Sequence, residues 1–251
     1  LSGKASAVLD PCGAMQIHLE LAPGRDQEIV FMLGACRSAD EARDLIRRGA
    51  SGAVRRAFES VRAYWTRVLA TVQVETPDPS VNVLANGWLL YQTIACRLWA
   101  RSGFYQSGGA YGFRDQLQDV MALVHAAPSL VREHILRSAA RQFREGDVQH
   151  WWHPPIGRGV RTHCSDDYLW LPLVTAHYVL SSGDTRLLEE RVPFLESAPL
   201  DLEVESRYES PLRSEEASTL YEHCVRSIRR GLRFGRHGLP LMGGGDWNDG
   251  M

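Results

Sequence analysis

Apolar residues recur at three- and four-residue spacing over most of this chain, and this spacing limits its fold more than any other feature. Leu84, Trp88, Tyr91, Ile94 and Leu98 form one such stripe. Similar stretches cover residues 116–126, 129–144, 167–181, 185–191 and 215–234. The spacing is that of one face of an α-helix, and Gly, Pro or Asp residues separate the stretches. Successive helices joined by long loops rich in Gly and Trp predict a mostly α fold, an α/α toroid with its site at one end.

The first third of the chain has a different pattern. Apolar residues alternate over 14–33 around a turn at residues 22–26, which predicts a β-hairpin. Ser38 and Glu41 form a capping box that opens a helix towards Arg48, and a second helix is predicted over 53–72. Pro77 and Pro79 then interrupt the chain. We therefore expect the end of a β domain at 1–37, a helical linker at 38–78 and a helical domain at 79–251.

Composition excludes several classes of protein. The 251 residues carry 28 basic against 30 acidic side chains, and 44% are hydrophobic, as in ordinary globular proteins. No apolar run is long enough to span a membrane, and the first residues lack the basic and then apolar segments of a signal peptide. We therefore expect no membrane contact within this chain. The arginines are interspersed with acids, which argues against nucleic acid as a partner. Five widely spaced cysteines predict reduced thiols and a cytoplasmic location.

The ends of the sequence suggest a piece of a larger protein. It opens on Leu1, and it stops at Met251 directly after a glycine-rich motif that carries two acids. We therefore expect that the chain is a fragment.

Three segments concentrate Gly, Trp, His, Arg and paired acids where no apolar period is found. They are residues 107–119, 146–170 and 241–250. Aromatic rings beside carboxylates and arginines are typical of sugar sites, where the ring covers the apolar face of a pyranose and the charged groups bind its hydroxyls. We expect this role for Trp151, Trp152 and Trp247, whereas Trp88 and Trp99 on predicted helices are expected in the core.

Two other kinds of site are disfavoured. His150, His153, His163 and Cys164 have a spacing that fits no standard zinc pattern, so we expect no metal site. The glycines at 243–245 lack the lysine of a phosphate loop and are better suited to close approach of the backbone to a sugar.

Four motifs resemble a known family. GAYGFRDQLQD, QHWWHPPIGRGVRTHCSDDYLWLP, TLYEHCVRSI and GLPLMGGGDWNDGM are similar, in this order, to the phosphorylases of glycoside hydrolase family 94. Within that family, the RTHCSDD segment favours the members that act on β-1,2-glucan, namely the cyclic β-1,2-glucan synthases and the β-1,2-oligoglucan phosphorylases. The resemblance covers residues 79–251 and implies roughly the first half of an (α/α)6 barrel. It also implies that residues 1–37 end a β-sandwich domain.

The resemblance implies inverting phosphorolysis of a β-glucan oligosaccharide, with inorganic phosphate as co-substrate and no other cofactor, to give α-glucose 1-phosphate. The general acid of the family falls on Asp249. One acid is sufficient because phosphate is itself an anionic nucleophile, whereas an inverting hydrolase needs a second carboxylate to activate water. An Asn-Asp-Gly turn is the structural alternative for Asp249.

Other site residues follow from the same motifs. Arg114 and Asp115 match the pair that holds the nonreducing glucose, with a structural ion pair as the alternative. Asp167 is assigned to the sugar site together with Trp152 and Trp247, although helix capping explains at least one of Asp166 and Asp167.

Two alternative functions remain open from the sequence. One is an inverting α/α-barrel hydrolase, which product analysis with and without phosphate would distinguish. The other is a carbohydrate-binding piece of a multidomain synthase without turnover of its own.

Overall fold

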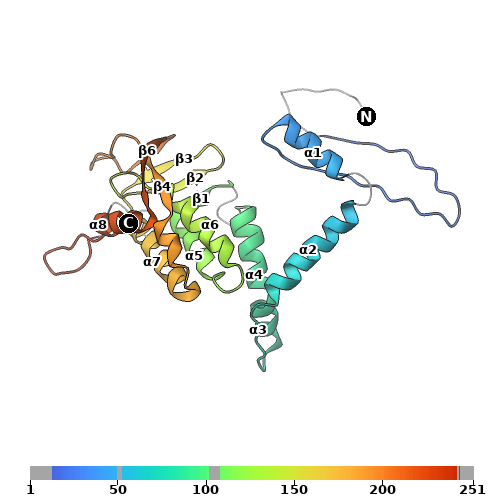
Figure 1. Cartoon of the computed structure of the whole chain (residues 1–251), viewed down its shortest axis with the longest axis horizontal. Coiled ribbons are helices and arrows are strands. Elements are labelled where there is room, and N and C mark those ends of the chain that lie inside the picture. Colours follow the sequence, from blue (N-terminus) through green and yellow to red (C-terminus); the bar gives the residue numbers. More distant parts are fainter. Residues whose placement is uncertain (1–12, 50–52, 102–107, 242, 244–251) are drawn as a thin grey trace. The chain divides into compact units, whose positions relative to one another are not determined.

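The computed structural model of the chain describes residues 13–49, 53–101, 108–241 and 243. They belong to two compact units, Leu1–Val61 and Arg62–Met251 (Figure 1). Helix α2 (Ala53–Leu69) contributes residues to both units.

The helix of the first unit, α1 (Ala39–Gly49), begins at the predicted capping box. The Ser38 hydroxyl accepts a hydrogen bond from the Glu41 amide at 3.2 Å, and the Glu41 carboxylate accepts one from the Arg37 amide at 2.9 Å. The Glu41 amide, one of those that the first turn leaves without a partner, is thereby satisfied, which confirms this start signal.

The predicted hairpin is only partly correct. Its turn forms, since the Arg25 amide donates to the Ala22 carbonyl at 3.1 Å. The prediction of paired strands is wrong, because residues 13–38 contain no strand and run as an extended loop (Figure 1). Its alternating apolar side chains are exposed: Met15, Ile17, Leu19 and Leu21. A two-stranded ribbon with an uncovered apolar face is marginal by itself.

The second unit opens with a helical stretch in four successive parts. These are α3 (Pro79–Val83), η1 (Leu84–Trp88), α4 (Leu89–Gln92) and η2 (Thr93–Trp99), of which η1 and η2 are π-helical. The Asp78 carboxylate caps the start by accepting from the Ser80 amide at 2.8 Å. Ile94 and Leu98 are buried, whereas Trp88 and Trp99 are about half exposed, contrary to our expectation for these two tryptophans.

Four longer helices and a 3₁₀ helix form the rest of the unit with two small sheets. The helices are α5 (Phe113–Met121), α6 (Pro128–Ala139), α7 (Ser165–Ser182), η3 (Thr185–Glu189) and α8 (Leu220–Gly231). The strands are β1 (Tyr111–Gly112), β2 (Gln149–His153), β3 (Arg158–Thr162), β4 (Arg191–Glu196), β5 (Ser206–Glu209) and β6 (Leu212–Thr219).

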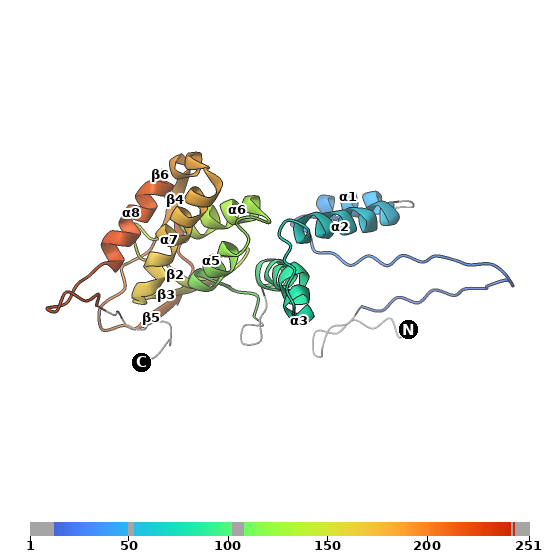
Figure 2. The same ribbon diagram turned by 90° about the horizontal axis from the view of Figure 1, so that it is seen from below.

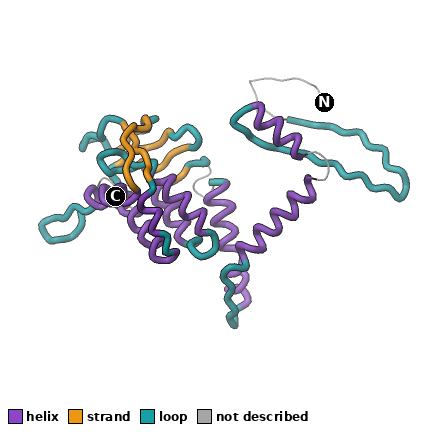
Figure 3. The backbone as a smooth tube through the Cα atoms, viewed as in Figure 1, coloured by secondary structure: helices purple, strands orange, loops and turns teal. Residues whose placement is uncertain are grey.

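One antiparallel sheet has the order β1-β2-β3-β5, and β4 pairs with β6 in the other. The strands gather at one end of the helices (Figure 3). Because β1 leads into α5 and β3 leads towards α7, both helices begin at the sheet.

The strands correct two predictions. Residues 215–234 do not form one helix, because β6 continues to Thr219 against β4 and α8 begins only at Leu220. The Thr219 hydroxyl marks this start by accepting from the Glu222 amide at 3.2 Å. The segments 107–119 and 146–170 are not loops alone, since they contain β1, β2, β3 and the first turns of α5 and α7.

Helices α5 to α8 enclose the core. Helix α5 packs on α6 and α7, and α7 packs on α8, as the turned view in Figure 2 also shows. The innermost side chains are apolar and have no exposed surface: Phe113, Leu117, Val120, Val131, Ile135, Leu171, Val174 and Leu220. This layer of helices agrees with the predicted mostly α class, while the incomplete (α/α)6 toroid stays a prediction. Among the described residues, no helix is both long and apolar enough to cross a membrane.

Candidate functional site

The first turns of α5 and α7 bring charged side chains together. Arg114 lies in the first turn of α5, and its guanidinium donates to the Asp166 carboxylate in the first turn of α7 at 2.8 Å. The Arg114 side chain is 8% exposed and that of Asp166 is 32% exposed. The ion pair therefore joins two helices whose starting points are set by the sheet.

Asp115 lies beside this ion pair and against the backbone of β1. A Cβ atom placed on Gly112 would lie 2.4 Å from the Asp115 Oδ2 atom. No ordinary contact is that short, so the position of the Asp115 carboxylate requires glycine at 112. The structure thus places Arg114 and Asp115 side by side at the start of α5, although the sequence predicted a helix only from residue 116. It also gives Arg114 a partner that the sequence did not indicate.

Asp167 is buried next to Asp166 and contacts His150 on β2. Its side chain is 1% exposed, and its Oδ2 atom lies 2.7 Å from His150 Nδ1. Burial raises the pKa of Asp167, and the contact with His150 offsets part of this increase. The carboxylates of Asp166 and Asp167 also lie in the first turn of α7, where the helix dipole favours negative charge.

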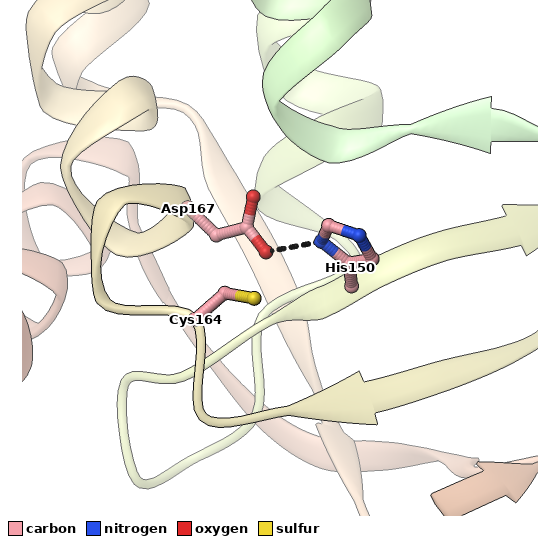
Figure 4. A group of neighbouring side chains, drawn as sticks. All are labelled: His150, Cys164 and Asp167. Atoms are coloured by element: carbon pink, nitrogen blue, oxygen red, sulfur yellow. Dashed lines mark hydrogen bonds and ion pairs between the residues drawn. The ribbon is translucent and has the colours of Figure 1, made fainter. Parts of the chain in front are cut away.

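A third side chain completes this cluster. The Cys164 thiol, at the N-terminal boundary of α7, lies beside His150 and Asp167 (Figure 4). One ligand-type atom of each of the three residues lies within 4.8 Å of the other two. The other candidate histidines lie elsewhere: His163 contacts the Asp201 carbonyl, and His153 packs against Trp151.

The two tryptophans of β2 have different environments. Trp152 is 1% exposed and packs against Tyr111 and Phe113, so its ring belongs to the core and offers no open face. Trp151 is half-buried and lines a hollow of about 220 Å³ with His153 and three small residues, Gly108, Ala110 and Gly112. Of the two, Trp151 has the ring surface that a ligand could reach.

Alternation along the strand explains this difference. Neighbouring residues on a strand point to opposite faces, so only one of the two tryptophans can face the core. The strand register that turns Trp152 towards the core is its pairing with Tyr111 of β1. This is a contact between distant parts of the chain. The sequence therefore indicated an aromatic site at 151–152 without showing which ring faces outward.

A backbone contact brings the C-terminal motif to the same helix start. The Gly243 amide donates to the Ser165 hydroxyl at 3.1 Å, and Ser165 is the first residue of α7. A Cβ atom on Gly243 would lie 1.9 Å from the His163 carbonyl oxygen, so only glycine permits this approach. The predicted residues Trp247 and Asp249 lie outside the described residues.

A hollow of about 360 Å³ opens beside this contact. Its lining includes Ser165, Tyr168, Arg230 and Gly243. Sequence reasoning missed Tyr168 and Arg230. Arg230 lies in the last turn of α8, where its position in an amphipathic helix gives no sign of a site.

Comparison with known proteins identifies the family. The family described as "Glycosyl hydrolase 94 superfamily, catalytic domain" matches residues 64–251, and "Glycosyl hydrolase 94, supersandwich domain" matches residues 1–51. These matches confirm the resemblance seen in the motifs.

Several curated relatives match over essentially the whole chain. It is 42% identical over 252 residues to the cyclic beta-(1,2)-glucan synthase NdvB of Rhizobium meliloti (strain 1021), covering 100% of this chain and 9% of that protein. It is 28% identical to the solabiose phosphorylase of Paenibacillus borealis, covering 100% of this chain and 29% of that protein. It is 25% identical to the N,N'-diacetylchitobiose phosphorylase of Vibrio proteolyticus, covering 99% of this chain and 32% of that protein.

The chain thus spans a third or less of the length of these relatives. Because the catalytic-domain match covers well over half of its residues, the chain belongs to the glycosyl hydrolase 94 superfamily.

Proposed function

We propose that this chain contributes the acid and the glucose-binding groups to a site for inverting phosphorolysis of β-glucan oligosaccharides. In this reaction inorganic phosphate attacks the anomeric carbon, and Asp249 protonates the oxygen of the leaving sugar. The products are α-glucose 1-phosphate and a shortened glucan. The relatives named as phosphorylases and as a β-1,2-glucan synthase support this choice of chemistry and substrate class.

The observation that carries the proposal is the hydrogen bond between the Gly243 amide and the Ser165 hydroxyl. It holds the start of the glycine-rich motif at the first turn of α7, beside Asp166 and Asp167. Asp249 follows Gly243 by six residues, and a chain of that length spans at most about 20 Å. A chain of this length permits the acid to reach the ion pair between Arg114 and Asp166, which is the position that the proposal requires.

The described groups suit the binding of a nonreducing glucose. The Arg114 guanidinium presents several N–H donors, and Asp115 and Asp166 supply carboxylate acceptors for sugar hydroxyls. Trp151 offers a ring face beside glycines that let a sugar approach the backbone. Trp247 and Asp167 complete the proposed set, with Asp167 behind the surface in contact with His150.

Replacing Asp249 tests the proposal directly. In the full-length protein, Asp249→Asn keeps the size of the side chain and removes its acidic proton. We expect phosphate-dependent release of glucose 1-phosphate from β-1,2-glucooligosaccharides to fall by about 100-fold or more, since general acid catalysis contributes roughly 10²- to 10⁴-fold.

Asp201→Asn is the matched control, because Asp201 is exposed. It should retain the rate of the parent. A near-parental rate for Asp249→Asn would refute the assignment of the acid, and equal cleavage with and without phosphate would favour the hydrolase alternative.

A further inference from the structure

We propose that His150, Cys164 and Asp167 form a binding site for a zinc-like divalent cation. The proposal does not depend on phosphorolysis. No metal site was predicted from the sequence, because only the spacing of His150 and Cys164 relative to His153 and His163 was compared with zinc patterns. The fold instead brings a carboxylate next to the first two residues (Figure 4).

The three ligand types suit this cation. Zinc binds imidazole nitrogen, thiolate sulfur and carboxylate oxygen, and sites with three protein ligands keep a fourth position for water or another molecule. Here one atom of each type lies within 4.8 Å of the others. Two of the ligands lie on regular elements, His150 on β2 and Asp167 in α7, and Cys164 directly precedes α7. Such supports hold ligands more precisely than mobile loops.

The Asp167 carboxylate provides independent evidence. Its Oδ2 atom contacts His150, while its Oδ1 atom is buried and has no hydrogen-bond partner within the part of the chain that the structure describes. A buried carboxylate oxygen without a partner is costly. A cation bound at Oδ2 would compensate the negative charge of this buried carboxylate.

The nearby arginine does not prevent cation binding. Arg114 carries positive charge close to the cluster, but its guanidinium is paired with Asp166 at 2.8 Å. The formal charges of the Asp166 and Asp167 carboxylates exceed that of the single guanidinium by one negative charge. The loss of the thiol proton from Cys164 would add a second negative charge.

Binding requires a small rearrangement and the release of a proton. Ligand atoms around a tetrahedral zinc ion lie roughly 3.3 Å apart or more, so His150 Nδ1 and Asp167 Oδ2, now 2.7 Å apart, must separate by about half an ångström. The proton of the hydrogen bond between His150 Nδ1 and Asp167 Oδ2 leaves this contact, so that the bound imidazole is neutral with its one proton on Nε2 and any excess proton passes to solvent. The thiol of Cys164 also loses its proton to solvent as the bond from sulfur to the metal forms. Affinity should therefore increase with pH.

The test measures metal binding by the full-length protein without substrate. After treatment with a chelator, Zn²⁺ is titrated in competition with a chromophoric chelator, and Co²⁺ is used to detect the thiolate-to-metal absorption band. We expect Cys164→Ser to bind one equivalent less than the parent and to lose the Co²⁺ band. Asp167→Asn should weaken binding by at least about tenfold, since even residues that only support metal ligands have effects of that size.

Cys96→Ser is the matched control, because Cys96 is exposed and lies outside the cluster. It should bind the same number of equivalents as the parent and keep the Co²⁺ band. Thermal unfolding without metal checks that each variant is folded, and if Cys164→Ser does not fold, Asp167→Asn decides alone. Unchanged binding by the folded variants would overturn the proposal, and so would an equal loss in Cys96→Ser.

Discussion

Arg114 illustrates what can be predicted for single residues. The motif around it predicted a sugar-binding pair on residues 114 and 115, and the structure places both residues at the start of α5. Its partner Asp166 lies 52 residues away, and that pairing depends on how α5 and α7 pack. The choice between Trp151 and Trp152 likewise depends on strand register. Residue types were therefore easier to predict than the contacts that decide their roles.

We expect Arg114→Lys to raise the KM for the oligosaccharide. Lysine keeps the positive charge and loses the planar arrangement of donors, which should cost roughly 1 to 3 kcal/mol of binding free energy. Steady-state kinetics of the full-length protein measure this change. Arg132→Lys is the control, since Arg132 also pairs with two acids, Asp184 and Glu190, on other elements. An unchanged KM for Arg114→Lys would leave this residue with a structural role only.

His134 makes stability depend on pH. It is 2% exposed, and burial together with repulsion from Arg137 lowers its pKa to about 3. The unfolded chain has a histidine pKa near 6.5 and therefore takes up a proton first as the pH falls. The contribution of His134 is fully present above pH 6.5 and is lost as the pH falls towards 3, at about 1.4 kcal/mol per pH unit.

Urea unfolding between pH 7 and pH 5 measures this dependence. His134→Asn should reduce the slope of the unfolding free energy against pH by that amount, and His237→Asn, at an exposed position, should leave the slope unchanged. A parental slope in His134→Asn would show that another group controls the pH dependence. His223, whose pKa burial lowers to about 4, should add a second contribution of the same sign.

Helix boundaries were predicted best where a local signal defines them. The capping box at Ser38 acts on amides a few residues away, so sequence was sufficient. Strand β6 was missed because its hydrogen-bond partner β4 lies in an earlier, separate part of the chain. Strands β2 and β3 pair with each other through nearby residues, but each also pairs with a distant strand, β1 or β5, which the sequence did not indicate. The helical spacing found over 215–234 holds only from Leu220 onward, because the preceding residues form a strand that pairs with β4.

Two glycines should respond in opposite directions to the same substitution. Gly183 ends α7 with φ at 74°, a left-handed conformation that a side chain disfavours, so Gly183→Ala should destabilise the protein by roughly 1 to 2 kcal/mol. Gly87 lies within the helical segment η1 and has open space where a Cβ would be placed, so Gly87→Ala should stabilise it by about 0.5 to 1 kcal/mol. Chemical unfolding of the two variants compares them, and equal effects would contradict this account.

At the scale of the whole molecule, the helical segment from Pro79 to Trp99 has an uncovered apolar surface. Leu84 is 45% exposed, Trp88 54% and Tyr91 41%. These side chains belong to the stripe that the sequence marked as a helix face, but the described residues bury only part of it. The period of a stripe predicts that a face is apolar, whereas its covering depends on neighbours that a single element does not specify.

We expect that residues 1–251 alone do not sustain phosphorolysis. They span 29% to 32% of two related phosphorylases, and no phosphate loop occurs in the sequence to position the nucleophile. Without a positioned phosphate, several kcal/mol of rate acceleration are lost. The assay is glucose 1-phosphate formation from β-1,2-glucooligosaccharides and phosphate, with the full-length protein as control. Sustained turnover by the 251 residues would show that they contain the complete site.

The ion pair between Arg114 and Asp166 links the proposed site to the packing of two helices. A ligand that takes the guanidinium donor now bonded to Asp166 competes with a carboxylate that already accepts from it. The net affinity of such a ligand is the difference between two bonds. Its binding would also loosen the contact between α5 and α7, so that occupancy of the site and the spacing of two helices share one thermodynamic cycle.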